Sequence, residues 1–143
     1  MWVKQINVFL ENQSGRLAEV TEVLSSSEID IRALYIADTT DYGILRMIVD
    51  KPAEAQIVLQ NAGFTVSQTS VIALAVPDKP GTLGKALGLL SQNNISLEYL
   101  YAFVGRASSD AVVVIRVDNG DEALNIFHMN GIKVLSPEEV YGI

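Results

Sequence analysis

The chain has 143 residues, 49% of them hydrophobic and none of them cysteine, and its formal net charge at pH 7 is −7. The lack of cysteine excludes disulfides and thiolate metal sites, and the acidic charge, spread over both halves, argues against binding to a phosphate backbone. No segment has the roughly 18–20 apolar residues that a membrane span needs. The N-terminus has no secretion signal, so we expect a cytoplasmic protein.

The first half of the chain predicts six elements in the order βαββαβ. Ile6, Val8 and Leu10 alternate with Gln5, Asn7 and Phe9, which indicates a half-buried strand. The polar turn "NQSG" (residues 12–15) then begins a helix whose apolar side chains recur at helical spacing from Leu17. The remaining elements are a strand over residues 29–37, a strand over 45–49, a helix from Pro52 to Gly63 and a short strand over 64–66.

The second half repeats the first. Gly15 matches Gly81 at an offset of 66 residues, and Leu17 matches Leu83. After the hairpin the offset becomes 68, as between Asp50 and Asp118, so the second repeat has two additional residues in a loop. We therefore expect an α+β protein of two ferredoxin-like βαββαβ units, residues 1–70 and 71–143. Because "FTVSQTSVIALAV" (residues 64–76) contains no flexible linker, we expect a fixed orientation between them.

The segment "DKPGTL" (Asp78 to Leu83) follows a strand and begins a helix, and a second strand follows that helix. This order resembles the ACT domain, a small ligand-sensing module of amino-acid metabolism. The equivalent "NQSGRL" (Asn12 to Leu17) departs from the ACT motif, since Ser14 stands where proline is usual. The resemblance covers both repeats, so the chain resembles a stand-alone tandem ACT protein.

The resemblance implies that two units lie side by side, with their second strands paired in one eight-stranded antiparallel sheet and the helices on one face. It also implies that free amino acids bind in the seam between the units. The turn of one unit would face the start of the second strand of its neighbour, which is Asp30 or Ser96. The candidate ligand-binding residues are Asn12, Gln13, Ser14, Gly15, Leu17, Asp30, Asp78, Lys79, Pro80, Gly81, Leu83 and Ser96.

Physical chemistry supports such a site independently of the family. A glycine at a helix start lets a ligand approach backbone N–H groups that the helix cannot satisfy, and this end favours a carboxylate. Asp30 or Asp78 could accept a hydrogen bond from an ammonium group. The alternative interpretation is structural: Asn12 and Asp78 would be turn formers or caps, Asp30 and Ser96 would face water, and Leu17 and Leu83 would be core residues.

Other residues favour structural interpretations. His128, the single histidine, has no cluster of potential metal ligands near it in the sequence, so we expect a solvated helix residue and no metal site. Glu138 and Glu139 are typical of a solvated turn. Gly84 and Gly88 cost a helix stability, and either a close approach at the seam or simple tolerance would account for them.

Two function classes remain open. Because the sequence has no catalytic, phosphate-binding or dinucleotide-binding motif, we expect no enzyme and no cofactor. The first candidate is an allosteric amino-acid sensor. The second is a regulatory or scaffolding subunit without a ligand, which would form a homodimer or dock on an enzyme of amino-acid biosynthesis. Its docking surface would be the open sheet face of the second unit, where the apolar residues Val71, Ala73, Val112 and Val114 would be exposed beside Lys133. The same face in the first unit is polar, with Gln5, Asn7, Arg46 and Thr65.

Overall fold

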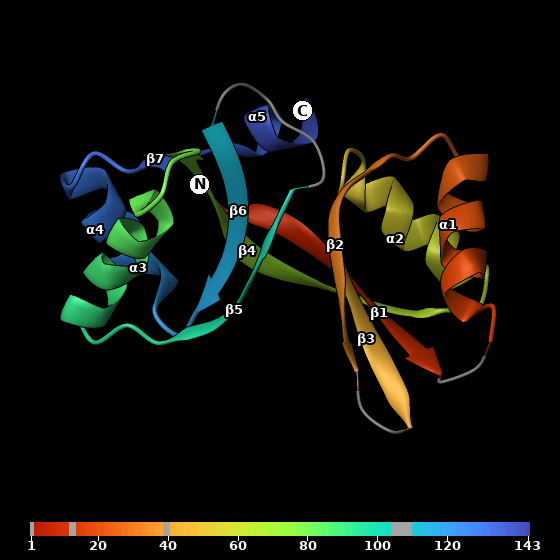
Figure 1. The fold of residues 1–143 in the computed structure, drawn as a ribbon. Coiled ribbons are helices and arrows are strands. Elements are labelled where there is room, and N and C mark those ends of the chain that lie inside the picture. Colours follow the sequence, from red (N-terminus) through yellow and green to blue (C-terminus); the bar gives the residue numbers. More distant parts are fainter. Residues whose placement is uncertain (1, 12–13, 39–40, 104–109) are drawn as a thin grey trace. The chain divides into compact units, whose positions relative to one another are not determined.

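The computed structural model describes residues 2–11, 14–38, 41–103 and 110–143 (Figure 1). Seven strands and five helices lie within these residues. In chain order they are β1 (Val3–Glu11), α1 (Arg16–Ser26), β2 (Ile31–Asp38), β3 (Tyr42–Val49), α2 (Pro52–Asn61), β4 (Thr65–Pro77), α3 (Thr82–Gln92), β5 (Leu97–Ala102), β6 (Asp110–Val117), α4 (Gly120–Met129), β7 (Lys133–Val134) and α5 (Pro137–Tyr141). The predicted α+β class and the repeated βαββαβ order are confirmed.

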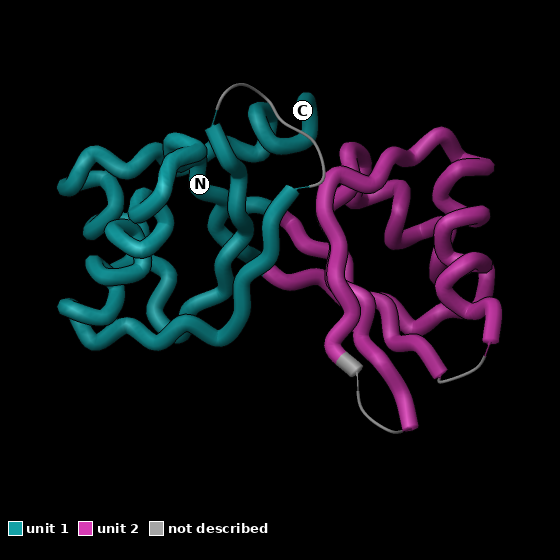
Figure 2. The backbone as a smooth tube through the Cα atoms, in the orientation of Figure 1, with its two compact units in different colours: residues 1–3, 70–143 teal, residues 4–69 magenta. Residues whose placement is uncertain are grey.

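The chain divides into two compact units (Figure 2). Unit 2 comprises residues 4–69, and unit 1 comprises residues 1–3 and 70–143. Unit 2 therefore contains most of the first repeat, and unit 1 contains the whole second repeat together with the start of β1.

Unit 2 is a sheet with two helices on one face. β3 pairs antiparallel with both β1 and β2, and Val8 lies opposite Leu45 on the adjacent strand. Figure 1 shows α1 and α2 on the same side of these strands. Burial of the apolar side chains between the sheet and the helices provides the main stabilisation, at about 25 cal/mol per Å². This core consists of Ile6, Val8, Leu10, Val20, Leu24, Ile29, Leu45, Met47, Val49, Ala55, Leu59 and Phe64.

Unit 1 repeats this arrangement. β6 pairs antiparallel with β4 and with β5, and β7 pairs with β4. Helices α3 and α4 lie together on one side of the strands (Figure 1). Its core consists of Ile72, Leu74, Val76, Ala86, Leu90, Ile95, Val113, Ile115, Val117, Ala123, Ile126 and Phe127, and Trp2 packs against it from the N-terminal segment.

Strand β4 belongs to both repeats, which explains why the described residues form seven strands rather than eight. The sequence predicted a short strand over residues 64–66 and a new strand at the start of the second repeat, but Thr65–Pro77 form one strand of 13 residues. No glycine or proline interrupts residues 65–76, so the backbone has no reason to turn there. The strand order is β2-β3-β1-β4-β6-β5, with β7 also paired to β4.

The open sheet face of unit 1 differs from the prediction. Val71, Ala73, Val112 and Val114 were expected to be exposed, but none has more than 4% of its surface exposed. The C-terminal segment of the same unit continues beside β4 past β7, because the Leu135 N–H donates to the Ala73 carbonyl oxygen at 2.9 Å. Leu135 and Val140 are themselves buried, and Figure 1 shows α5 across β4 and β6 from α3 and α4. The prediction that these four side chains are exposed is therefore wrong.

The segment that contains Glu138 and Glu139 is a helix rather than a solvated turn. Pro137 stands at the first position of α5, where its missing N–H costs nothing. Ser136 accepts a hydrogen bond from the Glu139 N–H, and the Glu139 carboxylate accepts one from the Ser136 N–H, both at 3.2 Å. This capping box satisfies two donors that the helix leaves unpaired.

Candidate functional site

The turn before α3 holds most of the candidate residues of the second repeat. Gly81 precedes the helix in the left-handed conformation, with φ of 90°, and no side chain caps the helix start. The Thr82 hydroxyl is shared between the carbonyl oxygens of Pro77 and Lys79, at 2.5 and 3.0 Å. Asp78, Lys79 and Pro80 are exposed in this turn. The turn therefore presents an ordered backbone to solvent at the positive end of a helix.

The turn before α1 has the same backbone geometry but different side chains. Gly15 has φ of 88°, and no side chain caps this helix either. Ser14 is exposed, while Asn12 and Gln13 lie outside the described residues. Arg16 stands where the second repeat has Thr82. Its guanidinium group lies over the Phe64 ring, 4.4 Å from the centroid, and is 2.8 Å from a Glu19 carboxylate oxygen.

The two leucines of the candidate set are not equivalent. Leu83 is half-buried and packs against the core of unit 1. Leu17 is 37% exposed, so its interpretation as a core residue is wrong. The leucine common to both repeats therefore contributes to a core in one unit only.

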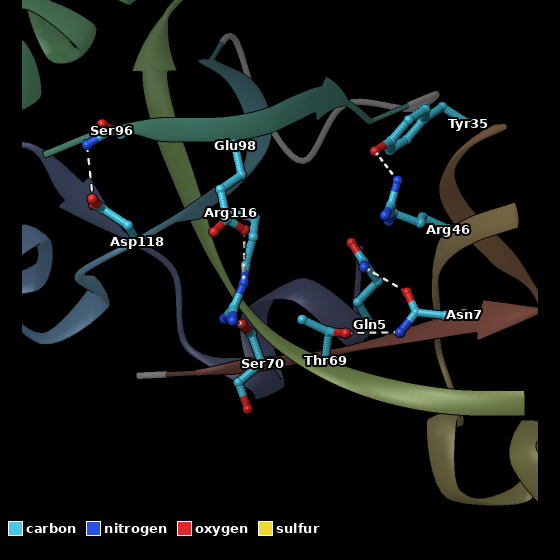
Figure 3. A network of polar contacts seen from close by, with 10 residues as sticks. All are labelled: Gln5, Asn7, Tyr35, Arg46, Thr69, Ser70, Ser96, Glu98, Arg116 and Asp118. Atoms are coloured by element: carbon cyan, nitrogen blue, oxygen red, sulfur yellow. Dashed lines mark hydrogen bonds and ion pairs between the residues drawn. The ribbon is translucent and has the colours of Figure 1, made fainter. Parts of the chain in front are cut away.

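The strand starts are held by a pair of hydrogen bonds that recurs in both units. The Asp30 N–H donates to the Asp50 carboxylate at 2.9 Å, and the Asp50 N–H donates back to the Asp30 carbonyl oxygen at 3.1 Å. In the second repeat the Ser96 N–H donates to the Asp118 carboxylate at 3.0 Å, and the Asp118 N–H donates to the Ser96 carbonyl oxygen at 3.1 Å (Figure 3). The candidate residues predicted from the sequence did not include Asp50 and Asp118, although their spacing of 68 residues already marked them as a repeated pair.

The side chains at these strand starts are exposed and differ between the repeats. The Asp30 carboxylate accepts a hydrogen bond from Arg32 at 2.8 Å, which orients it along β2. Ser96 lies at the edge of a depression of about 420 Å³. The other residues around this depression are Leu87, Leu90, Ser91, Asn94, Ile95 and Leu97.

Within one unit, the turn and the strand start lie at opposite ends of a helix. Helix α3 has 11 residues, which makes it about 16 Å long, and Gly81 precedes it while Ser96 follows it. Gly15 and Asp30 stand in the same relation to α1. Because an α-amino acid carries both charges on one carbon, it cannot bridge that distance. The turn and the strand start of one unit therefore cannot both contact the same amino acid.

A polar network occupies the sheet of unit 2 where the sequence predicted a wettable face. Gln5 is fully buried and donates to the Asn7 side chain at 2.7 Å, and Asn7 donates to the Thr69 hydroxyl at 2.7 Å (Figure 3). Arg46 donates to the Tyr35 hydroxyl at 2.7 Å. These bonds offset the cost of burying polar groups. Gln5 therefore belongs to the interior of the protein and not to a wet surface.

The described residues contain neither a cluster of potential metal ligands nor a membrane-spanning helix. No group of three or more histidine, aspartate or glutamate side chains in residues 2–11, 14–38, 41–103 and 110–143 could hold a metal ion. No helix in the same residues is both long and apolar enough to cross a membrane.

Comparison with known proteins decides the family. A family described as an ACT domain pair matches residues 1–142. The chain belongs to the ACT domain family. The repeated units are thus ACT units, and the resemblance that the turn sequences carry is confirmed. No curated protein matches the chain at a significant level.

Solved structures give the same fold. Protein BT0572 from Bacteroides thetaiotaomicron is 40% identical, with a TM-score of 0.93, and the match covers 100% of this chain and 98% of that one. The ligand-free regulatory subunit of aspartate kinase from Thermus thermophilus is 16% identical, with a TM-score of 0.60, over 88% of this chain and 90% of that one. The corresponding subunit from Thermus flavus is 15% identical, with a TM-score of 0.57, over the same shares of the two chains. At these identities the two aspartate kinase subunits show a common fold and nothing further.

Proposed function

We propose that this ACT domain pair is a non-catalytic regulatory protein that binds a free amino acid. The observation that carries the proposal is the match of the ACT domain pair over residues 1–142. The ligand would lie between the turn of one ACT unit and the strand start of the other, with the residues of that site as predicted from the sequence. The division at residues 70 and 71 and a cytoplasmic location also remain predictions.

The chemistry of the two regions suits a zwitterion. The α-carboxylate would accept hydrogen bonds from the first backbone N–H groups of α3. Gly81 leaves the approach open, because a Cβ there would have no described atom within 4 Å other than those of the adjacent residues. The ammonium group would donate to a carboxylate or hydroxyl at a strand start, Asp30 or Ser96. Only a ligand that carries both a carboxylate and an ammonium group can form both sets of hydrogen bonds.

Calorimetric titration of the full chain with each proteinogenic amino acid tests the proposal. We expect saturable heat with one amino acid or a small group of them, and no heat with the corresponding amines that lack the carboxylate. The variants Asp30→Asn and Ser96→Ala each remove one proposed partner while leaving the backbone bonds to Asp50 and Asp118 in place. The variant at the occupied site should weaken binding about tenfold, as expected for a lost hydrogen bond of about 1.4 kcal/mol.

Two matched variants control for effects on folding. Asp121→Asn removes an exposed carboxylate from the first turn of α4, far along the chain from both turns. Ser25→Ala removes an exposed hydroxyl from α1 that donates to the Glu22 carbonyl oxygen at 3.1 Å. Both should leave the affinity unchanged. The absence of heat with every amino acid contradicts the proposal.

A second candidate is a role in which the protein docks on an enzyme of amino-acid biosynthesis or on a second copy of itself without a ligand. An exposed aromatic pair in unit 2 favours it. The rings of Phe9 and Tyr42 are stacked with centroids 4.8 Å apart, and they are 43% and 39% exposed. Sedimentation of the full chain tests the homodimer: a concentration-dependent dimer that Phe9→Ser abolishes would support it, and a monomer at all concentrations would contradict it.

A further inference from the structure

A groove on unit 1 lies apart from the turns and strand starts. It has a volume of about 470 Å³ and lies between α4 and β7. Its lining comprises Leu124, Asn125, His128, Ile132, Lys133 and Val134. The three apolar members are half-buried and pack against the core of unit 1, while the three polar members are exposed. The groove thus has an apolar floor and a polar rim, as small-molecule sites generally have.

The groove exists because the last strand of the second repeat is short. In unit 2 the same position is covered, since Gln68 on β4 donates to Gln56 on α2 at 2.5 Å. The counterparts at an offset of 68 are Ser136 and Leu124. β7 ends at Val134, and Ser136 caps α5 instead of continuing the strand. Leu124 therefore lacks the cover that its counterpart in the first repeat has.

The rim of the groove is suited to an anion. Asn125 and His128 make no side-chain hydrogen bond within the described parts of the chain, so both can donate to a ligand. The Lys133 ammonium group is 3.3 Å from a Glu139 carboxylate oxygen, which leaves donors available, since an ammonium group has three.

The first repeat has no such rim. At the positions of Asn125, His128 and Lys133 it has Ile57, Gln60 and Thr65, none of which carries a charge. The two repeats thus share a fold but differ at this place in both shape and charge. The second repeat both lacks the glutamine pair that covers this place in the first repeat and has the cationic Lys133 there. The two differences together make an open groove with a positively charged rim.

We propose that the groove between α4 and β7 binds a small monocarboxylate with an apolar body, such as a branched aliphatic or aromatic acid. The apolar body would lie on Leu124, Ile132 and Val134, and the carboxylate would accept hydrogen bonds from Lys133 and His128. The volume is within the range of about 300–1,000 Å³ that is typical of ligand sites. Since the groove is open to solvent, we expect an affinity on the order of 1 mM for a probe of this size.

Proton NMR of the imidazole ring tests the proposal, because the full chain contains a single histidine. 4-Methylpentanoate is the probe, and 4-methylpentanamide is the control with the same apolar body and no charge. We expect a saturable shift of the His128 signals with the carboxylate and a response at least tenfold weaker with the amide. A shift that does not saturate, or equal binding of the amide, would overturn the proposal.

Substitutions that restore the residues of the first repeat sharpen the test. Leu124→Gln and Lys133→Thr should each weaken the probe about tenfold, and an unchanged amide NMR spectrum shows that each variant is folded. The variant Gln60→His places an imidazole at the equivalent position of unit 2, where the cover is present. That imidazole should not respond, and an equal response there would overturn the proposal. Because the readout is local to the groove, its result is independent of amino-acid binding at the turns.

Discussion

At the scale of single residues, the glycines of the second repeat separate into two kinds. Gly81 has φ of 90°, a conformation that L side chains rarely adopt, whereas Gly84 lies within helix α3 without a positive φ. At neither position would a Cβ come within 4 Å of a described atom beyond the adjacent residues and the backbone of the same helix. The backbone therefore favours glycine at residue 81, whereas no contact among the described residues requires it at residue 84. This favours simple tolerance of Gly84 over a close approach between elements.

Alanine at these two positions should have opposite effects on stability. Gly81→Ala should lower the free energy of unfolding by about 1–2 kcal/mol, because the left-handed conformation is strained for alanine. Gly84→Ala should raise it by about 0.4–1 kcal/mol, because alanine loses less backbone entropy in a helix. Urea denaturation of the two variants measures both changes, and effects of the same sign would contradict this assignment.

The repeat made part of the candidate site predictable at this scale. Gly15 and Gly81 were found from their spacing, and both directly precede a helix as expected. The pairing of Asp30 with Arg32 was not predictable in this way, because the second repeat has Ser96 and Glu98 at those positions. Glu98 instead pairs across the strands with Arg116, at 3.5 Å. A repeat preserves backbone positions, but charge pairs depend on neighbours that each repeat has changed separately.

At the scale of elements, the C-terminal helix α5 depends on a few exposed polar bonds. The sequence "SPEE" (residues 136–139) carries the signature of a capping box with proline at the first helical position, yet the adjacent acidic residues favoured a solvated turn. The helix positions Val140, which is fully buried. The hydrogen bond with the Ser136 backbone, and then that with the Lys133 side chain, lower the pKa of Glu139.

The stability of α5 should therefore depend on pH through Glu139. A pKa that is lowered in the folded state means that the charged carboxylate stabilises the helix above the ordinary glutamate pKa of about 4.3. This contribution is lost as the pH falls through the lower, folded value. Amide hydrogen exchange of residues 138–142 should be faster in Glu139→Gln than in the unaltered chain near neutral pH, and the difference should vanish in acid.

Glu138→Gln is the matched control for that experiment. It removes the same charge one residue earlier and breaks neither bond of the capping box. The exchange rates of this variant should stay close to those of the unaltered chain at each pH. If the two variants behave alike, net charge rather than the capping box determines the effect.

At the scale of the whole molecule, the boundaries of the repeats in sequence and of the units in space do not coincide. The repeats divide near residue 70, but residues 1–3 belong to unit 1 together with the second repeat. The sequence could predict the repeat from its spacing. The sequence could not predict that residues 1–3 belong to unit 1. The second repeat has no counterpart of these residues, and the pattern of β1 continues through Val3 and Lys4 without a break. Trp2 shows the consequence, since it packs against the core of unit 1.

Replacement of Trp2 should therefore destabilise unit 1, although most of the first repeat, to which Trp2 belongs in sequence, forms unit 2. A Cβ at Gly120 would lie 1.9 Å from the Trp2 ring, which shows how closely the indole covers the start of α4. Trp2→Ala should lower the stability of unit 1 by about 2 kcal/mol, less than the 3–5 kcal/mol of a fully buried tryptophan, because this side chain is half-buried. Hydrogen exchange resolved by residue should show faster exchange in α4 than in the unaltered chain, with α2 much less affected. Phe9→Ala, which removes an exposed aromatic ring from unit 2, should leave α4 unchanged, and faster exchange in α2 than in α4 after Trp2→Ala would contradict the assignment of the N-terminal segment to unit 1.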